Sequence, residues 1–396
     1  MFLAYFCTKL FALSTTVSIV SISSFSPLGT TAQEVWNNYL NTASLIKNTT
    51  IGNKIVPAAA LNPEQLELVE SLKNYDPKYN SLDNSVLYAM LASRGTLQSA
   101  GWTESDVFGI NIGSSRGATD LFEKHYSKFI ETGKTAVQAS PATTLGNISS
   151  WVAQDLKSTG PEISHSITCS TALHALLNGV AWLRGGMADK FLVGGSEAPL
   201  TAFTIAQMQA MKIYSSLDGD YPCRAFDFDK KVNTMVLGEG AASACLELGK
   251  HPDAIAYIEG IGYATETLKH SVSISNDAEC MQKSMLMALK DTPVQDVDAI
   301  VMHAPGTIKG DTSEYAAIQK IFGDNMPLLT TNKWKVGHTF GASGLLSLEF
   351  AALMLQNNHF IGVPFVNGEI QTKPLRKILV NAVGFGGNAV SILISK

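Results

Sequence analysis

The length and composition of the chain favour a large α/β protein with a well-buried core. It has 396 residues, of which 45% are hydrophobic and 16% are charged, which is enough for two domains or one large duplicated domain. A net charge of −5 argues against a nucleic-acid-binding protein. The five cysteines show no Cys-x-x-Cys or Cys/His ligand spacing, so neither a disulfide framework nor a metal site is expected, and the cytoplasm is the simplest compartment.

The apolar N-terminus allows two interpretations. Residues 1–25 resemble a secretory signal peptide in hydrophobicity, but they lack a basic segment and a small-residue cleavage site. Residues 17–25 are instead rich in β-branched residues, which favours a strand, and the capping box from Thr31 to Glu34 predicts the start of a helix. We assign no role to residues 1–16 and expect no membrane-spanning segment.

The periodicity of apolar residues predicts alternating helices and strands along the rest of the chain. Residues 47–80 are polar and are expected to form an irregular surface excursion. In chain order, helices are predicted over 80–94, 120–131, 141–157, 170–184, 278–289, 314–322 and 344–356, and strands over 107–114, 163–167, 190–196, 235–248, 254–264, 297–303 and 377–394, the last interrupted by a glycine turn.

The two parts of the chain repeat a similar order of elements. Residues 107–117 and 297–307 each combine a strand with a polar turn, and the strand over 235–248 corresponds to the final strand. The sequence therefore predicts two similar α/β halves, covering residues 17–249 and 250–396.

Cys169 lies where a predicted strand meets a predicted helix. Unpaired backbone N–H groups and the positive end of the helix dipole meet at such a position, which favours a thiolate and predicts a lowered pKa for Cys169. The alternative is that Cys169 is a small buried hydrophobic residue. This stretch alone does not decide between them.

His303 and His338 also lie at predicted turns between strands and helices. A single histidine at the end of a strand is more often structural than catalytic. Two histidines at such turns, together with a cysteine at a third, favour a covalent thiol catalyst because open α/β sheets place reactive groups there.

The ordered set of motifs resembles the β-ketoacyl-[acyl-carrier-protein] synthases of the Cys-His-His type over residues 17–396. Cys169 matches the family's nucleophile and His303 matches its first histidine. Lys333 and His338 match the Lys and His of Thr-Lys-x-x-x-Gly-His, and Phe385 matches the gating Phe of Gly-Phe-Gly-Gly. Further matches are Arg224, Phe226, Asp227, Gly238–Gly240, Asp311, Glu314, Gly341, Ala342 and Gly344.

The resemblance implies a thiolase-like fold, in which two duplicated α/β halves form five αβαβα layers. It also implies that Cys169 accepts an acyl group from a carrier protein and that malonyl-carrier protein then loses CO2 and condenses with it. The backbone N–H groups of Cys169 and Phe385 would form an oxyanion hole, and His303 and His338 would stabilise the enolate. Lys333 and Glu314 would form a supporting network or, structurally, an internal ion pair.

The family's partners are implied in the same way. The resemblance implies an acyl carrier protein, acyl and malonyl thioesters, and a homodimer or a heterodimer with a related subunit. Carrier proteins are acidic, so Lys124, Lys128 and Lys134 are candidates for a docking patch, although they also fit an ordinary solvated helix face. Neither a metal nor a cofactor is expected, because the phosphopantetheine arrives on the carrier protein.

Several positions depart from the family pattern. Pro305 replaces the first Thr of His-Gly-Thr-x-Thr, so that only Thr307 remains as a candidate contact for the pantetheine arm. Trp334 and Lys335 replace smaller or apolar residues, and Asn388 replaces a Thr. These differences suggest the hypothesis of a specialised pathway, producing a polyene or polyketide chain, rather than housekeeping fatty-acid synthesis.

Other functions fit the sequence less well. A degradative thiolase typically has a second, C-terminal cysteine, and a Cys-His-Asn synthase has Asn at the position of His338. A non-catalytic chain-length-factor-like subunit typically lacks the cysteine, yet it stays the main alternative. A cysteine hydrolase would not explain the Gly-Phe-Gly-Gly and Gly-His-x-x-Gly-Ala turns.

Overall fold

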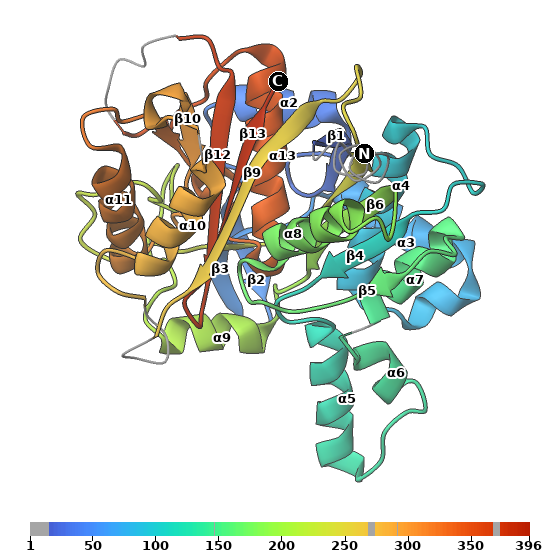
Figure 1. The fold of residues 1–396 in the computed structure, drawn as a ribbon. Coiled ribbons are helices and arrows are strands. Elements are labelled where there is room, and N and C mark those ends of the chain that lie inside the picture. Colours follow the sequence, from blue (N-terminus) through green and yellow to red (C-terminus); the bar gives the residue numbers. More distant parts are fainter. Residues whose placement is uncertain (1–15, 146, 268–273, 291, 367–372) are drawn as a thin grey trace, which may run out of the picture.

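The computed structural model describes residues 16–145, 147–267, 274–290, 292–366 and 373–396. Its large sheet follows the order β11-β10-β12-β13-β9-β1-β8-β6-β4-β5 (Figure 1). These strands are β1 (Val17–Phe25), β4 (Gly109–Gly113), β5 (Glu162–Ile163), β6 (Lys190–Glu197), β8 (Gly240–Leu248), β9 (Ala256–Thr265), β10 (Ala299–Val301), β11 (Leu328–Thr330), β12 (Lys377–Gly384) and β13 (Asn388–Ser395).

The sheet has the same arrangement in its two halves. On one side β5, β4 and β6 are parallel, β8 is antiparallel to β6, and β1 is antiparallel to β8. On the other side β11, β10 and β12 are parallel, β13 is antiparallel to β12, and β9 is antiparallel to β13. The halves join where Val17–Ile19 of β1 pair with Ala256–Ile258 of β9.

Helices form three layers around these two halves of the sheet. α4 and α7 cover the outer face of one half, α10 and α11 cover the outer face of the other, and α8 and α13 lie between the halves (Figure 1). The predicted five-layered thiolase-like arrangement is therefore confirmed. The principal helices are α4 (Asn84–Ala100), α7 (Asn147–Leu156), α8 (Thr171–Arg184), α10 (Glu279–Leu289), α11 (Ile308–Phe322) and α13 (Ser343–Asn357).

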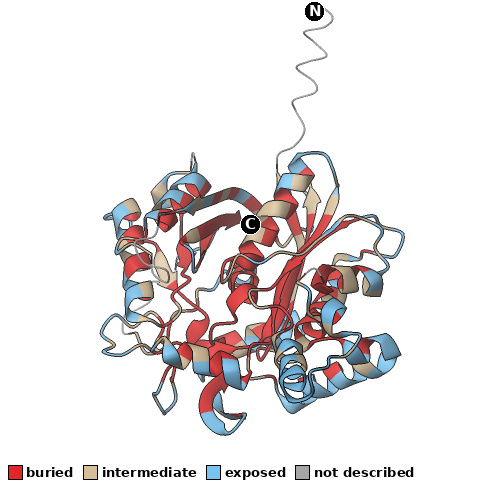
Figure 2. Cartoon of the chain, turned by 90° about the horizontal axis from the view of Figure 1, so that it is seen from below, coloured by how far each residue is buried: buried red, intermediate tan, exposed pale blue. Residues whose placement is uncertain are grey.

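Buried residues are concentrated in the middle of the molecule (Figure 2). Every residue of α13 from Ser343 to Leu355 is buried, as expected for a helix that is apolar on all sides. Because α8 and α13 pack against each other, the loops at their N-termini are held close together. Those loops contain Cys169 and His338.

The other predictions from sequence are mostly confirmed, with differences at element boundaries. The strand over 17–25 is β1, and Thr31 forms the predicted capping box. The helix predicted over 141–157 is instead two helices, and the strand predicted over 235–248 is interrupted at Glu239. Further helices are α2 (Ala32–Leu40), α5 (Thr119–Thr132), α6 (Ala139–Thr143), α9 (Ala202–Ala210) and α12 (Lys333–Val336).

The prediction of an irregular excursion over residues 47–80 was wrong. β2 (Lys47–Ile51) and β3 (Lys54–Ala59) form a hairpin whose turn contains Gly52 at φ 62°, a conformation that glycine adopts readily. α3 (Pro63–Tyr75) follows the capping box of Asn62. A third short strand, β7 (Leu237–Gly238), pairs with β3. Of the predicted N-terminal extension, residues 1–15 lie outside the described residues, so that only Thr16 is described.

Candidate active site

Cys169 lies between β5 and α8, in a tight turn. Thr168 has φ 47°, an uncommon conformation for a residue other than glycine, and such strained residues are concentrated at functional sites. The predicted strand before Cys169 is only the two residues of β5. The Cys169 side chain is 6% exposed.

The prediction of a lowered pKa for Cys169 was wrong. Burial raises the pKa of the Cys169 thiol to about 12, and the charge of Glu197 raises it further, while Lys333 and Arg116 act in the opposite direction. Cys169 lies at the helix terminus as predicted, but burial of the thiol is the largest influence on its pKa and disfavours the charged thiolate. The resting residue is therefore a neutral thiol.

We expect this thiol to react slowly with iodoacetamide at neutral pH. Because only the thiolate is a nucleophile, the rate of alkylation at Cys169 should rise about tenfold per pH unit from pH 7 to pH 10. Mass spectrometry of tryptic peptides would follow Cys169 specifically. A rate that reaches a plateau below pH 8 would contradict the neutral thiol.

His303 follows β10, and a buried carboxyl group holds its backbone. The two oxygens of Glu314 accept hydrogen bonds from the backbone N–H groups of His303 (2.9 Å) and Ala304 (2.8 Å). Ala304 has φ 24°, so this contact holds a strained turn. Burial, and secondarily the charge of Lys333, lower the pKa of His303 to about 3.

His338 faces His303 from the other half of the site. Its backbone N–H donates to the carbonyl oxygen of Val236 at 2.7 Å, and the two imidazole rings meet edge to face with centroids 5.1 Å apart. Burial, then His303 and Lys333, lower the pKa of His338 well below its ordinary value. Both imidazoles are therefore neutral at physiological pH and can donate a hydrogen bond without carrying a charge.

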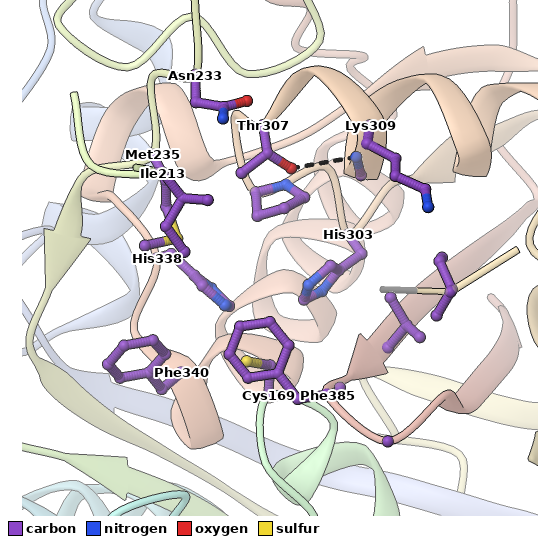
Figure 3. Close-up of a pocket in the computed structure, with 16 residues that line it drawn as sticks. Cys169, Ile213, Asn233, Met235, His303, Thr307, Lys309, His338, Phe340 and Phe385 are labelled. Carbon is purple, nitrogen blue, oxygen red and sulfur yellow. Dashed lines mark hydrogen bonds between the residues drawn. The ribbon is translucent and has the colours of Figure 1, made fainter. Parts of the chain in front are cut away.

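One pocket brings together five of the predicted residues, Cys169, His303, Thr307, His338 and Phe385, whereas Lys333 and Glu314 do not line it (Figure 3). Both imidazoles point into it, and the Phe385 ring is seen in front of Cys169 in this view, with 40% of the residue's surface exposed. The pocket is lined by Cys169, Ile213, Asn233, Met235, Ile274, His303, Pro305, Thr307, Lys309, Gly310, His338, Phe340, Val383, Gly384, Phe385 and Gly386.

The Phe385 turn is bonded to the Cys169 turn. The hydroxyl of Thr168 donates to the carbonyl oxygen of Phe385 at 3.3 Å. Asn388 accepts a hydrogen bond from the Ser170 hydroxyl at 2.7 Å and donates one to the carbonyl oxygen of Phe385 at 3.3 Å. Asn388, a departure from the family pattern, thus connects the two turns.

Lys333 lies behind the histidines and forms no direct ion pair with Glu314. Its ammonium group donates to the side-chain oxygens of Asn332 (2.9 Å) and Ser347 (3.2 Å). Burial lowers the pKa of Lys333 to about 8, although the charge of Glu314 opposes this shift. Glu314 therefore anchors the backbone of His303, while Lys333 acts on both imidazoles through its charge.

A second buried acidic group holds the rim of the pocket. Asp311 forms an ion pair with Lys230 at 2.7 Å and accepts hydrogen bonds from the backbone N–H groups of Phe226 and Gly306, each at 3.0 Å. Thr307 begins α11, and its side-chain oxygen accepts from the N–H of Gly310 at 3.1 Å. The hydroxyl hydrogen of Thr307 remains available to a ligand.

Family models match the chain in two adjacent segments. Residues 14–251 match the N-terminal domain of β-ketoacyl synthases, and residues 255–368 match their C-terminal domain. The chain belongs to the β-ketoacyl synthase family.

Relatives of this β-ketoacyl synthase extend over nearly its whole length. It is 26% identical to 3-oxoacyl-[acyl-carrier-protein] synthase 2 of Coxiella burnetii, covering 96% of this chain and 98% of that protein. Identity to the Rhizobium meliloti protein of the same name is 30%, over 81% of this chain and 83% of that one.

Solved structures share the fold at lower sequence identity. A type II polyketide ketosynthase, bound to the hexaketide and solved in complex with its acyl carrier protein, superposes with a TM-score of 0.84 at 19% identity, covering 96% and 99% of the two chains. A β-ketoacyl synthase from Burkholderia phymatum has a TM-score of 0.82 at 20% identity, with the same coverage.

Two polar residues near Cys169 in this β-ketoacyl synthase, Glu197 and Arg116, were not predicted from the sequence. Glu197 ends β6 and is buried. It accepts hydrogen bonds from the backbone N–H groups of Ser115, Arg116 and Gly341 at 3.0, 3.1 and 2.8 Å. Burial raises the pKa of Glu197 to about 7. The only sequence signal was its position after the glycines of a buried strand, which does not reveal its partners.

Proposed function

We propose that the protein is a β-ketoacyl-[acyl-carrier-protein] synthase that condenses malonyl-carrier protein with an acyl group held on Cys169. The observation that carries the proposal is the convergence of Cys169, His303 and His338 on one pocket, beside the Phe385 turn. The acyltransferase class agrees with the curated relatives. The presence of all three residues argues against the alternative, a non-catalytic chain-length-factor-like subunit.

The first half-reaction transfers the acyl group to the cysteine. The Cys169 sulfur attacks the carbonyl carbon of an acyl-pantetheine thioester, a carbon–sulfur bond forms, and the pantetheine sulfur leaves with the proton that Cys169 loses. We assign the stabilisation of the tetrahedral oxyanion to the backbone N–H groups of Cys169 and Phe385. The hydrogen bond between Thr168 and Phe385 supports this role because it holds the two turns together.

The second half-reaction forms the new carbon–carbon bond. The malonyl thioester loses CO2, and its thioester oxygen takes up the negative charge of the enolate. Neutral imidazoles of His303 and His338 would donate hydrogen bonds to that oxygen, and the enolate carbon would then attack the acyl-cysteine carbonyl and release Cys169. Phosphopantetheine remains on the carrier protein, so the protein requires no cofactor of its own.

The entrance of the pocket suggests how the carrier protein's arm is held. Thr307 lines it with a free hydroxyl hydrogen, and we assign that group to the pantetheine arm. Pro305 lines the same entrance without a hydroxyl group. Lys309 also lines the pocket and is, like Lys124, Lys128 and Lys134, a candidate cation for an acidic carrier protein.

We further propose that the protein functions as a dimer built on the edge of the large sheet. β5 is the outermost strand in that sheet, and an unpaired edge is a template for a second copy. Helix α5, which projects from the body (Figure 1), carries no buried residue and exposes Phe122, Tyr126, Phe129 and Ile130 on one side. Light scattering would test this arrangement, and a monomer at micromolar concentration would contradict it.

The proposed activity predicts a covalent intermediate. Incubation with acyl-carrier proteins should increase the intact mass of the protein by one acyl group, and Cys169→Ala should abolish that increase because it removes the nucleophile. Adding malonyl-carrier protein should then discharge the adduct and yield a β-ketoacyl product. The absence of an adduct with every acyl chain would instead favour a non-catalytic subunit.

The departures at Pro305, Trp334 and Asn388 support a specialised chain-building pathway. Trp334 and Lys335 both bind the segment that begins at Asn41. The Lys335 ammonium donates to the carbonyl oxygens of Asn41 and Ala43, and the Ser44 hydroxyl donates to the carbonyl oxygen of Trp334. Growth of a cell lacking its housekeeping synthase, when supplied with this protein, would contradict specialisation.

Among the described residues, no helix is both long and apolar enough to cross a membrane.

A further inference from the structure

Arg116 lies on the loop that follows β4 and contacts the ring of Phe340. Its guanidinium carbon is 5.8 Å from the centroid of the Phe340 ring. The same ring meets His338 edge to face at 5.3 Å and belongs to the apolar cluster that contains Cys169. The charge of Arg116 is also close enough to influence Cys169 electrostatically.

The donors of Arg116 are incompletely used. One terminal nitrogen donates to the side-chain oxygen of Gln207, whereas Nε is buried and has no acceptor among the described residues. No carboxylate in the described part of the chain forms an ion pair with this guanidinium. Glu197, the nearby acid, is occupied by backbone N–H groups and Ser114. A buried donor without an acceptor is costly, so this group is suited to a ligand.

Phe340 connects the pocket to Arg116, because it lines the pocket and contacts the guanidinium group, which is not itself among the lining residues. With the pantetheine arm assigned to the side of Thr307, we direct an acyl group on Cys169 toward Phe340, which lies on another side of the pocket (Figure 3). There the apolar cluster adds Ile205 and Met208 of α9 to Phe340. Gln207 lies on the same helix, and its hydrogen bond with Arg116 places two polar side chains beside this apolar cluster.

We propose that Arg116 is a specificity-determining residue that binds a carboxylate at the far end of the acyl chain. This inference rests on the proposed function. Guanidinium groups bind carboxylates in a planar, two-pronged geometry, which would use Nε together with a terminal nitrogen. A plain alkyl end would leave the buried donor unsatisfied. The substrate class is therefore an ω-carboxyacyl thioester.

The test compares acyl donors of equal length. Butyryl, hexanoyl and octanoyl pantetheine thioesters would be paired with succinyl, adipyl and suberyl thioesters, and acylation of Cys169 would be followed by intact mass. For at least one length, we expect the ω-carboxy donor to react roughly tenfold to hundredfold faster, the effect of one charge-assisted hydrogen bond. Arg116→Met should reverse this preference, Arg116→Lys should retain part of it, and the exposed Lys47→Met should leave it unchanged.

The outcomes separate this inference from the proposed function. Acylation by plain and ω-carboxy donors at equal rates in the wild-type protein would overturn the role of Arg116 and leave the synthase activity intact. No acylation by any donor would overturn the proposed function. If Arg116→Met fails to fold, the comparison of donors in the wild-type protein still tests the role of Arg116. Gln207→Leu provides a second variant. It should weaken the preference for ω-carboxy donors, because it removes the side chain that holds the guanidinium group in place.

Discussion

Replacing His338 with alanine is expected to reduce decarboxylation of malonyl-carrier protein by roughly 10²–10³-fold, the usual effect of removing one donor to a developing oxyanion. The low pKa values of His338 and His303 are the reason for this expectation, because both imidazoles are neutral and can act as donors. Release of CO2 from malonyl-carrier protein measures this step alone, without requiring an acyl chain.

His338→Asn distinguishes a donor from a base. An asparagine amide donates a hydrogen bond but does not accept a proton at physiological pH, so this variant should recover at least about tenfold of the rate lost in His338→Ala if donation is the role. Equal rates for the two variants would mean that proton transfer by His338 is essential. Near-equal melting temperatures would establish that neither variant is misfolded.

The sequence predicted the layers of the fold because those depend on local periodicity. The uniform hydrophobicity of α13 predicted a buried helix, and the matching strand orders in the two halves reflect a repeat that is visible in the chain. The β2–β3 hairpin was missed because Lys47–Ile51 is mostly polar, so that no apolar alternation indicates a strand. Gly52 in its turn was the one local signal of a hairpin.

The candidate site was predictable where its chemistry follows a motif. Cys169, His303 and His338 each lie at a turn that the sequence identifies, and the structure places them in one pocket. The pKa of Cys169 was not predictable because it depends on burial by Phe340 and its neighbours, which come from distant parts of the chain. Arg116 and Glu197 escaped notice for the same reason.

Glu314→Ala is expected to destabilise the protein by about 3–5 kcal/mol. The carboxyl group is fully buried and accepts hydrogen bonds from the N–H groups of His303 and Ala304 and from the side-chain amide of Asn381, the last at 3.2 Å. Alanine would leave these donors unsatisfied, and each buried unsatisfied donor costs about 1–3 kcal/mol. It would also remove the carboxyl group whose negative charge stabilises the buried ammonium group of Lys333. Denaturation in urea would measure the loss.

Glu314→Gln provides the matched control because it keeps the shape of the side chain. Its amide oxygen can accept from one of the two backbone donors, while its NH2 group opposes the other, so the loss of stability should lie between those of the wild-type protein and Glu314→Ala. Both variants should lower the rate of decarboxylation more than the rate of acyl transfer, because the displaced loop carries His303 but not Cys169. Equal effects on the two half-reactions would mean that Glu314 maintains the site as a whole. Unchanged stability in Glu314→Ala would show that the 303–304 turn holds its conformation without the carboxyl group.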